Sequence, residues 1–198
     1  MKRLLWRLLL ITLTLGVLYQ GWLFAHVCWW IDHNPSRSAF MSARLADMRD
    51  DDPDAELHHR WVPYERISRN LKRAVMASED AKFLQHAGFD WEGMQTAWEK
   101  NLKKGRIVAG GSTISQQLAK NLFLSGKRTP WRKGEEAIIT FMLEQMMSKR
   151  RIFEIYLNVI EWGDGVFGAE AAARHYFRKP ASALTASEAA RLAAMVPN

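Results

Sequence analysis

Residues 71–88 read LKRAVMASEDAKFLQHAG, and this stretch places an acidic residue beside the apolar face of a predicted helix. At about 100° per residue, Leu71 and Val75 share one face of that helix. Glu79 lies on the flank of this face, and Asp80, one step further on, is expected to point toward water. A carboxyl beside apolar side chains resists ionisation, so Glu79 is a candidate general acid or base near neutral pH. The competing interpretation is an ordinary carboxylate at a solvated helix end.

Outward from this stretch, the pattern from Glu65 onward is helical, with almost no strand signal. Apolar periodicity predicts helices at about residues 68–80, 90–103, 113–123, 131–147, 149–158, 165–175 and 185–195. Capping boxes are predicted at Thr113 with Gln116 and at Thr185 with Glu188. The fold class is therefore mainly α.

Length, charge and cysteine content narrow the choice of compartment and partner. At 198 residues the chain fits one domain plus an appendage. The net charge of +7 favours anionic partners, namely nucleic acid, acidic lipid headgroups or a phosphorylated substrate. The single cysteine, Cys28, forms no internal disulfide, so cysteine usage does not assign a redox compartment.

Residues 8–31 contain no Asp, Glu, Lys or Arg and read LLLITLTLGVLYQGWLFAHVCWWI. This length spans a hydrocarbon core of about 30 Å. Because Lys2, Arg3 and Arg7 precede the stretch, the positive-inside rule places residues 1–7 in the cytoplasm and the remainder outside. A cleaved signal peptide is the alternative, but the end of the stretch offers no small-residue cleavage site. We expect an uncleaved single-pass anchor.

Residues 32–60 are expected to form a connector to a folded domain at 61–198. The acidic run at 50–54 is most simply a solvated loop. His58 and His59 suggest a metal site, but no cysteine or nearby carboxylate pattern supports one.

Three further clusters accompany the glutamate: GGSTISQQLAKN at 110–121, RTPWRKGEE at 128–136 and KRRIFEIYLN at 149–158. The first supplies a loop and helix start whose backbone N–H groups are suited to holding an anion. Together the clusters add a second carboxylate, Glu136, and a band of cations: Lys120, Arg128, Arg132 and Lys133. A base, a second carboxylate and a cation band suit glycosyl transfer from a phosphate-linked donor.

Each cluster also has a structural interpretation. Ser112 and Thr113 can serve only as a helix cap, and the cations can form a solvated face. Glu136 can simply pair with Arg132 at i,i+4. The remaining polar residues are left open or structural: Gln116 and Gln117 contact either sugar hydroxyls or buried backbone, whereas Glu154 and Tyr156 are expected to be structural.

In order and spacing, the four clusters resemble the motifs of the peptidoglycan glycosyltransferase family, and the short anchored chain resembles its monofunctional members. The resemblance covers residues 61–198. Phe153 stands where the fourth motif usually has leucine, a mild apolar exchange. The chain stops at residues 195–198, where family members usually continue, so the domain is expected to lack its C-terminal end.

The resemblance implies a lysozyme-like helical domain with a small membrane-facing jaw, which polymerises lipid II. In this family's reaction, attack inverts the anomeric centre, forms a β-1,4 glycan and releases undecaprenyl diphosphate. Glu79 would be the base that activates the acceptor hydroxyl, and Glu136 the second essential carboxylate. Lys120 and Arg128 would hold the donor pyrophosphate. The other positions matching the donor side are Ser112, Thr113, Gln116, Gln117, Asn121, Arg132 and Lys133.

The same resemblance sets expectations for cofactors, partners and location. The sequence requires no cofactor, and for a divalent cation (Mg²⁺ or Mn²⁺) Asp80 is a conceivable ligand. The expected partners are lipid II, the growing glycan strand and the bilayer, with penicillin-binding and cell-division proteins as candidates and no nucleic acid. The expected location is the bacterial cytoplasmic (inner) membrane, with the catalytic domain on the periplasmic side.

Apolar residues between the first two clusters are open to two interpretations: Phe89, Trp91, Met94, Trp98, Ile107 and Val108. They suit insertion into the membrane interface. Alternatively, Trp91, Met94 and Trp98 form a core stripe at i, i+3 and i+7.

Three rival functions use the same features. A glycan hydrolase needs a carboxyl acid but not a cation band, because its leaving group is a sugar hydroxyl. A non-catalytic cell-wall scaffold does not need the motif set, and a nucleic-acid binder does not fit an outward-facing domain. No Ser-x-x-Lys occurs in the sequence, so transpeptidase activity is not expected.

Overall fold

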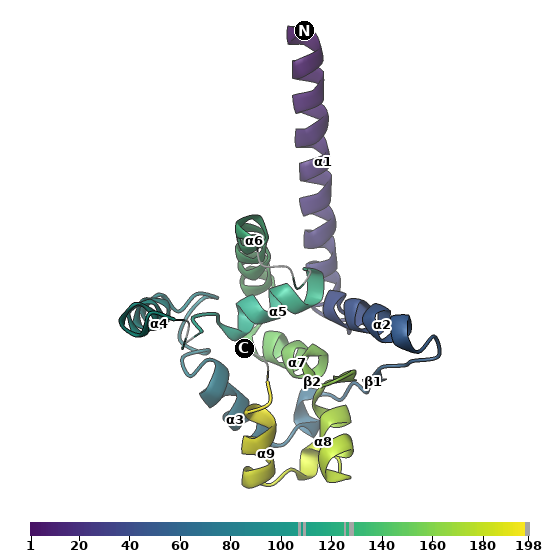
Figure 1. Ribbon diagram of the computed structural model, residues 1–198, viewed down its shortest axis with the longest axis vertical. Coiled ribbons are helices and arrows are strands. Elements are labelled where there is room, and N and C mark those ends of the chain that lie inside the picture. Colours follow the sequence, from purple (N-terminus) through teal and green to yellow (C-terminus); the bar gives the residue numbers. More distant parts are fainter. Residues whose placement is uncertain (107, 109, 125, 127–128, 197–198) are drawn as a thin grey trace.

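The computed structural model describes all residues except 107, 109, 125, 127, 128, 197 and 198. Its first helix, α1 (Lys2–Trp29), projects away from the other elements (Figure 1). Within the described chain this helix is the one long and apolar enough to cross a membrane. Only 6 % of its most apolar window is buried, which distinguishes it from the core helix of a soluble protein. This agrees with the anchor expected at residues 8–31.

The C-terminal end of α1 packs against the helical domain. Leu23 and Val27 are fully buried, whereas Leu15, two turns earlier, is exposed. The rings of Trp22 and Trp30 lie 6.4 Å and 5.0 Å from the ring of Phe123. The anchor is therefore packed onto the domain as well as covalently linked to it.

The segment expected to be a connector contains a helix, α2 (Ala39–Asp51). Ser38 caps it by accepting a hydrogen bond from the backbone N–H of Met41. Met41 and Leu45 are buried on one face of this helix. Because α2 continues to Asp51, the acidic run expected to be a loop at 50–54 begins inside the helix. The i, i+4 spacing of Met41 and Leu45 was the available signal.

The described residues include three short strands: β1 (His58–His59) lies near the end of the expected connector, and β2 (Glu161–Gly163) and β3 (Val166–Phe167) follow the fourth cluster. The sheet order is β1-β3-β2. β1 pairs parallel to β3, with His58 opposite Val166, and β2 pairs antiparallel to β3 across an irregular register. These strands displace the start of the helix expected at 165–175.

That helix, α8 (Ala169–Phe177), begins only after Gly168. Gly168 has φ 84°, and a Cβ there would lie 2.7 Å from the carbonyl oxygen of Asn158. Only glycine satisfies both the positive φ and this close approach. The glycine therefore separates the sheet from the helix, which periodicity alone does not show.

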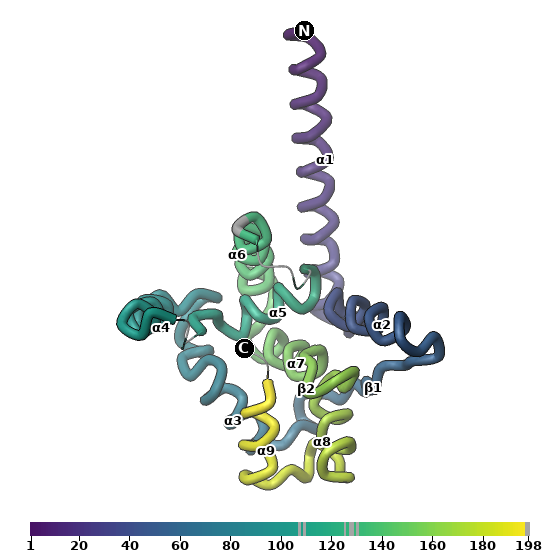
Figure 2. The backbone as a smooth tube through the Cα atoms, in the orientation of Figure 1, coloured from purple at the N-terminus to yellow at the C-terminus, as the bar shows by residue number. Residues whose placement is uncertain are grey.

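The other helices lie close to their predicted ranges, and α5 is central (Figure 2). They are α3 (Arg69–Glu79), α4 (Trp91–Lys104), α5 (Ile114–Phe123), α6 (Pro130–Met146), α7 (Lys149–Val159) and α9 (Ala186–Ala193), with short 3-10 turns η1 (Tyr64–Arg66) and η2 (Ala181–Ala183). The predicted capping boxes at Thr113 and Thr185 are both present. α5 packs against α2, α6 and α7, and α3 packs against α9.

Helix α4 lies to one side of α5 and α3 (Figure 1). Its apolar side chains Trp91, Trp98 and Leu102 are 70 %, 66 % and 64 % exposed. The core-stripe interpretation of Trp91 and Trp98 is therefore wrong, although Ala97 on the same helix is buried. The exposed stripe is consistent with the expected interfacial jaw.

Candidate active site

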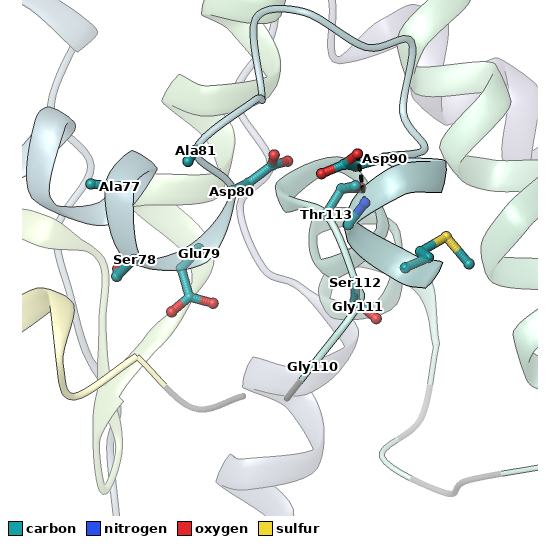
Figure 3. A pocket seen from close by; sticks show the side chains of 12 residues that line it. Ala77, Ser78, Glu79, Asp80, Ala81, Asp90, Gly110, Gly111, Ser112 and Thr113 are labelled. Atoms are coloured by element: carbon teal, nitrogen blue, oxygen red, sulfur yellow. Dashed lines mark hydrogen bonds between the residues drawn. The ribbon is translucent and has the colours of Figure 1, made fainter. Parts of the chain in front are cut away.

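A cavity of about 220 Å³ lies between the C-terminal end of α3 and the segment that leads into α5 (Figure 3). The carboxyls of Glu79 and Asp80 leave the end of α3 in different directions. The segment 110–113 forms the opposite wall, and Met94 and Asp90 complete the lining. The first two sequence clusters therefore meet in one cavity, as their resemblance to the family motifs implied.

Glu79 is half-buried at this cavity. Its Oε2 accepts a hydrogen bond of 2.8 Å from Nε2 of Gln117. Burial raises the pKa of the Glu79 carboxyl above its ordinary value, while the Gln117 hydrogen bond and the charge of Lys120 act in the opposite direction. The expected sheltered carboxyl is thus found, and it retains its proton to a higher pH than a solvated glutamate.

Asp80 does not point toward water, so that expectation is wrong. It is buried, and its two oxygens each lie 3.0 Å from Nε2 of His86. Its Oδ2 also accepts a hydrogen bond of 3.0 Å from the backbone N–H of Ile114. The physical reason is that α3 ends at Glu79, and Asp80 has non-helical dihedrals (φ −161°, ψ 79°), so the helical angle cannot be extrapolated to it.

These contacts also change two expectations, one for anion binding at the start of α5 and one for metal binding by Asp80. Two of the N-terminal N–H groups of α5 are already bonded to side chains, with Ile114 donating to Asp80 and Gln116 donating to Oγ1 of Thr113 (3.2 Å), so these two are not open to an anion. Asp80 is committed to His86 and Ile114, which leaves it poorly suited to the conceivable metal role. No group of three or more potential metal ligands occurs within the described part of the chain.

Thr113 and Gln116 serve the backbone rather than a ligand. Oε1 of Gln116 accepts from the N–H of Thr113 at 3.0 Å, and Oγ1 of Thr113 donates to the carbonyl of Gly88 at 2.7 Å. Ser112, by contrast, is exposed, and Nζ of Lys133 lies 3.4 Å from its Oγ. Ser112 is therefore an exposed hydroxyl on the wall of the cavity, where a ligand could reach it.

Glu136 organises two of the predicted cations. It is 3 % exposed, and its Oε2 lies 3.2 Å from Nη1 of Arg132. Its other oxygen accepts from Lys133. The ion pair between Glu136 and Arg132, which was the structural interpretation of Glu136, is confirmed. A buried carboxylate paired in this way is well suited to holding cations in place.

A second cavity of about 230 Å³ adjoins the first and shares Met94, Gly111 and Ser112 with it. Lys133 and Trp98 are among its other lining residues. The carboxyl of Glu79 and the cation Lys133 therefore line two adjoining cavities that share one wall.

The remaining predicted residues are placed as follows. Lys120 is near enough to Glu79 to lower its pKa, and its Nζ lies 5.6 Å from the ring centre of Phe40 on α2. Nδ2 of Asn121 donates to the carbonyl of Gln117 at 2.8 Å, so Asn121 supports α5 and not the cavity. Arg128 lies outside the described residues.

Two residues that the sequence analysis did not assign to the site contact it indirectly. His86 holds Asp80, and the hydroxyl of Tyr156 donates a 2.8 Å hydrogen bond to Oε1 of Gln117. The sequence signal that could have assigned Tyr156 to the site is its position on the apolar face of a predicted helix, because a buried hydroxyl requires a hydrogen-bond partner. Its burial was predictable, but the identity of the partner was not.

Comparisons with known proteins agree with one another on the family that this chain resembles. A family model described as Transglycosylase matches residues 46–198. A biosynthetic peptidoglycan transglycosylase from Methylobacillus flagellatus is 71 % identical over 197 residues, covering 100 % of this chain and 86 % of the relative. The proteins of the same name from Laribacter hongkongensis and Chromobacterium violaceum are 72 % and 64 % identical, covering 94 % and 100 % of this chain and 82 % and 87 % of the relatives.

Proposed function

The chain belongs to the transglycosylase family and is a glycosyltransferase of peptidoglycan synthesis; from this premise we propose that it polymerises lipid II into β-1,4 glycan strands. We assign residues 1–7 to the cytoplasm, 8–31 to the membrane, 32–60 to a connector and 61–198 to a periplasmic catalytic domain. Three basic residues, Lys2, Arg3 and Arg7, precede the anchor, and their position supports this orientation in the inner membrane.

The observation that carries the proposal is the half-buried carboxyl of Glu79 in a cavity beside Lys120. Glu79 accepts the proton of the acceptor sugar's 4-hydroxyl as that oxygen attacks C1 of the donor. The C1–O bond to the diphosphate breaks, and its electron pair leaves with undecaprenyl diphosphate. Because attack and departure occur on opposite faces of C1, the configuration inverts.

The cations stabilise the negative charge that develops on the leaving diphosphate. Lys120 and the pair Arg132 and Lys133 are the described candidates, and Arg128 joins them by the family resemblance. Glu136 acts by holding Arg132 and Lys133, since it accepts from both. Its role is therefore to organise the donor side and not to transfer a proton.

The anchor brings this site to its substrate. Lipid II is held in the outer leaflet by its polyprenyl tail, so an enzyme held in the same membrane meets it at raised effective concentration. The exposed apolar stripe of α4 is suited to the interface beside the cavity. The sequence contains no Ser-x-x-Lys, and we propose penicillin-binding and cell-division proteins as partners that would cross-link the strands.

The test is Glu79→Gln in the full chain, assayed with labelled lipid II by gel separation of the products. The amide keeps the size of the carboxyl but cannot accept the proton, so we expect chain formation to be abolished while helical circular dichroism is unchanged. Glu56→Gln, at an exposed position, is the matched control. Retained polymerisation by Glu79→Gln would remove this mechanism, and release of fragments from mature cell wall would favour a hydrolase.

A further inference from the structure

A buried chain of two hydrogen bonds links Glu79 to a tyrosine on a different helix. Tyr156 on α7 donates to Oε1 of Gln117 at 2.8 Å, and Nε2 of Gln117 donates to Oε2 of Glu79 at 2.8 Å. Tyr156 is fully buried and Gln117 nearly so. Three helices, α3, α5 and α7, thus each contribute one member of the chain.

The direction of this chain matters because the Gln117 amide has two unlike ends. Its NH₂ group stabilises an ionised carboxylate, whereas its carbonyl oxygen would repel one. A hydroxyl that donates to the carbonyl end holds the NH₂ end toward Glu79. Burial, followed by the charges of Glu79 and Asp80, raises the pKa of Tyr156 well above its ordinary value, so this hydroxyl keeps its proton.

We propose that Tyr156 is a positioning residue, which fixes the Gln117 amide so that its NH₂ group orients the Glu79 carboxylate and stabilises its ionised form. The inference rests on the proposed function, in which Glu79 is the general base. Tyr156 touches neither substrate nor reacting atoms and acts only through Gln117.

Other charged groups lie near Glu79 and must be held constant. Lys120 on α5 favours the ionised carboxylate, whereas the neighbouring Asp80 and the cavity residue Asp90 carry the same charge sign as Glu79. Burial is the largest influence and opposes ionisation. Without the oriented amide, one of the two stabilising influences is lost, and the pKa of Glu79 is expected to rise further.

The experiment is the pH dependence of kcat/KM for lipid II polymerisation by the full chain with Tyr156→Phe. This change removes only the hydroxyl. We expect activity near neutral pH to fall by about 2- to 10-fold, and the acidic limb of the profile to move to higher pH. At pH values above the moved limb, activity is expected to recover toward that of the unchanged chain.

The matched control is Tyr176→Phe, because the Tyr176 hydroxyl donates to the carbonyl of Trp162 at 3.0 Å, away from Glu79. This control is expected to leave the acidic limb in place. An unmoved limb in Tyr156→Phe, or an equal loss of activity at every pH, would overturn the inference, since a merely structural role does not shift a titration.

A second variant, Gln117→Leu, makes the test independent of any folding defect in Tyr156→Phe. Gln117→Leu should move the limb in the same direction, and adding Tyr156→Phe to it should produce no further shift. An additive shift would contradict the inference. If Glu79→Gln still polymerises lipid II, the proposed role of Glu79 as general base fails; if it is inactive while these limbs do not move, only the role of Tyr156 fails.

Discussion

Two adjacent carboxylates at the end of α3 have opposite environments. Glu79 is half-buried with one hydrogen-bond donor and a raised pKa, whereas Asp80 is buried and bonded to His86 and Ile114. The difference arises because the helix ends between them, so the two carboxyls point in different directions and Asp80 meets the N-terminus of α5. One residue is therefore available for proton transfer, and the other joins the two walls of the cavity.

The raised pKa of Glu79 has a consequence for stability as well as for catalysis. In the unfolded chain the carboxyl has its ordinary pKa of 4.5, and burial raises it in the folded chain. Folding thus favours the protonated form, a contribution that is present below the unfolded pKa and lost as pH rises through the folded pKa. Glu79→Gln is always neutral, so it does not lose this contribution.

We therefore expect the stability of Glu79→Gln, relative to the unchanged chain, to increase as the pH rises above the unfolded pKa of 4.5 and to level off above the folded pKa. Urea unfolding of both full chains in detergent micelles, across this pH range, measures the difference. A difference that stays flat or shrinks with rising pH would mean that Glu79 is not held in a disfavoured ionised state.

At the scale of the element, α5 connects the parts of the site. Its N-terminus is fixed to α3 by Asp80 and to Gly88 by Thr113, and its middle carries Gln117 and Lys120 toward Glu79. Nearly all of its side chains are buried, because α2, α6 and α7 pack around it. A small displacement of this helix moves the hydrogen-bond donor and the cation away from Glu79 together.

Removing the caps of α5 and α9 in turn tests how much the attachment of the α5 N-terminus contributes to stability and activity. Thr185→Ala removes an exposed cap of α9 and should cost about 0.5–2 kcal/mol of stability. Thr113→Ala removes a cap and also the buried donor to Gly88, which adds a penalty of about 1–3 kcal/mol for the unpaired carbonyl. Thermal unfolding measures both costs, and lipid II turnover should fall only in Thr113→Ala. Equal stability losses would show that the Gly88 contact contributes little.

At the scale of the whole molecule, the anchor is joined to the catalytic domain by packing and by a hydrogen-bonded clamp. Arg151 on α7 donates from Nε to the carbonyl of Trp30 at 2.9 Å and from Nη2 to the carbonyl of His33 at 2.6 Å. Trp30 in turn packs on Phe123, the last residue of α5. The C-terminal end of α1 is thus fixed to the helix that carries Gln117 and Lys120.

Leu23→Ala tests this connection. Leu23 is fully buried where α1 meets the domain, so its truncation should cost about 2–5 kcal/mol. Leu15→Ala, on the same helix at a position that is 61 % exposed, should leave the stability of the domain unchanged. Thermal unfolding of both full-length variants in one detergent gives the comparison. Equal melting temperatures for the two would show that the anchor is only a tether.

The sequence alone was sufficient for the features that depend on neighbouring residues. The long apolar helix at the N-terminus, most helix ranges and the capping boxes of Thr113 and Thr185 follow from spacings of a few positions, and the structure confirms them. The sheltered state of Glu79 was also predictable, because its apolar neighbours lie one turn away. The α2 helix was readable from Met41 and Leu45 but was not predicted.

Only the tertiary structure decided the contacts between distant segments. Asp80 is 34 residues from the N–H of Ile114 that it accepts from, and Gln117 is 38 and 39 residues from its partners Glu79 and Tyr156. Periodicity says which face of a helix is buried, but it does not say which polar group on another helix meets that face. Periodicity also gives no information beyond the end of a helix. Asp80 points inward just after α3 ends, and α8 begins only after Gly168. The direction of a side chain beyond a helix end, and the partner of a buried hydroxyl, depend on how the helices pack.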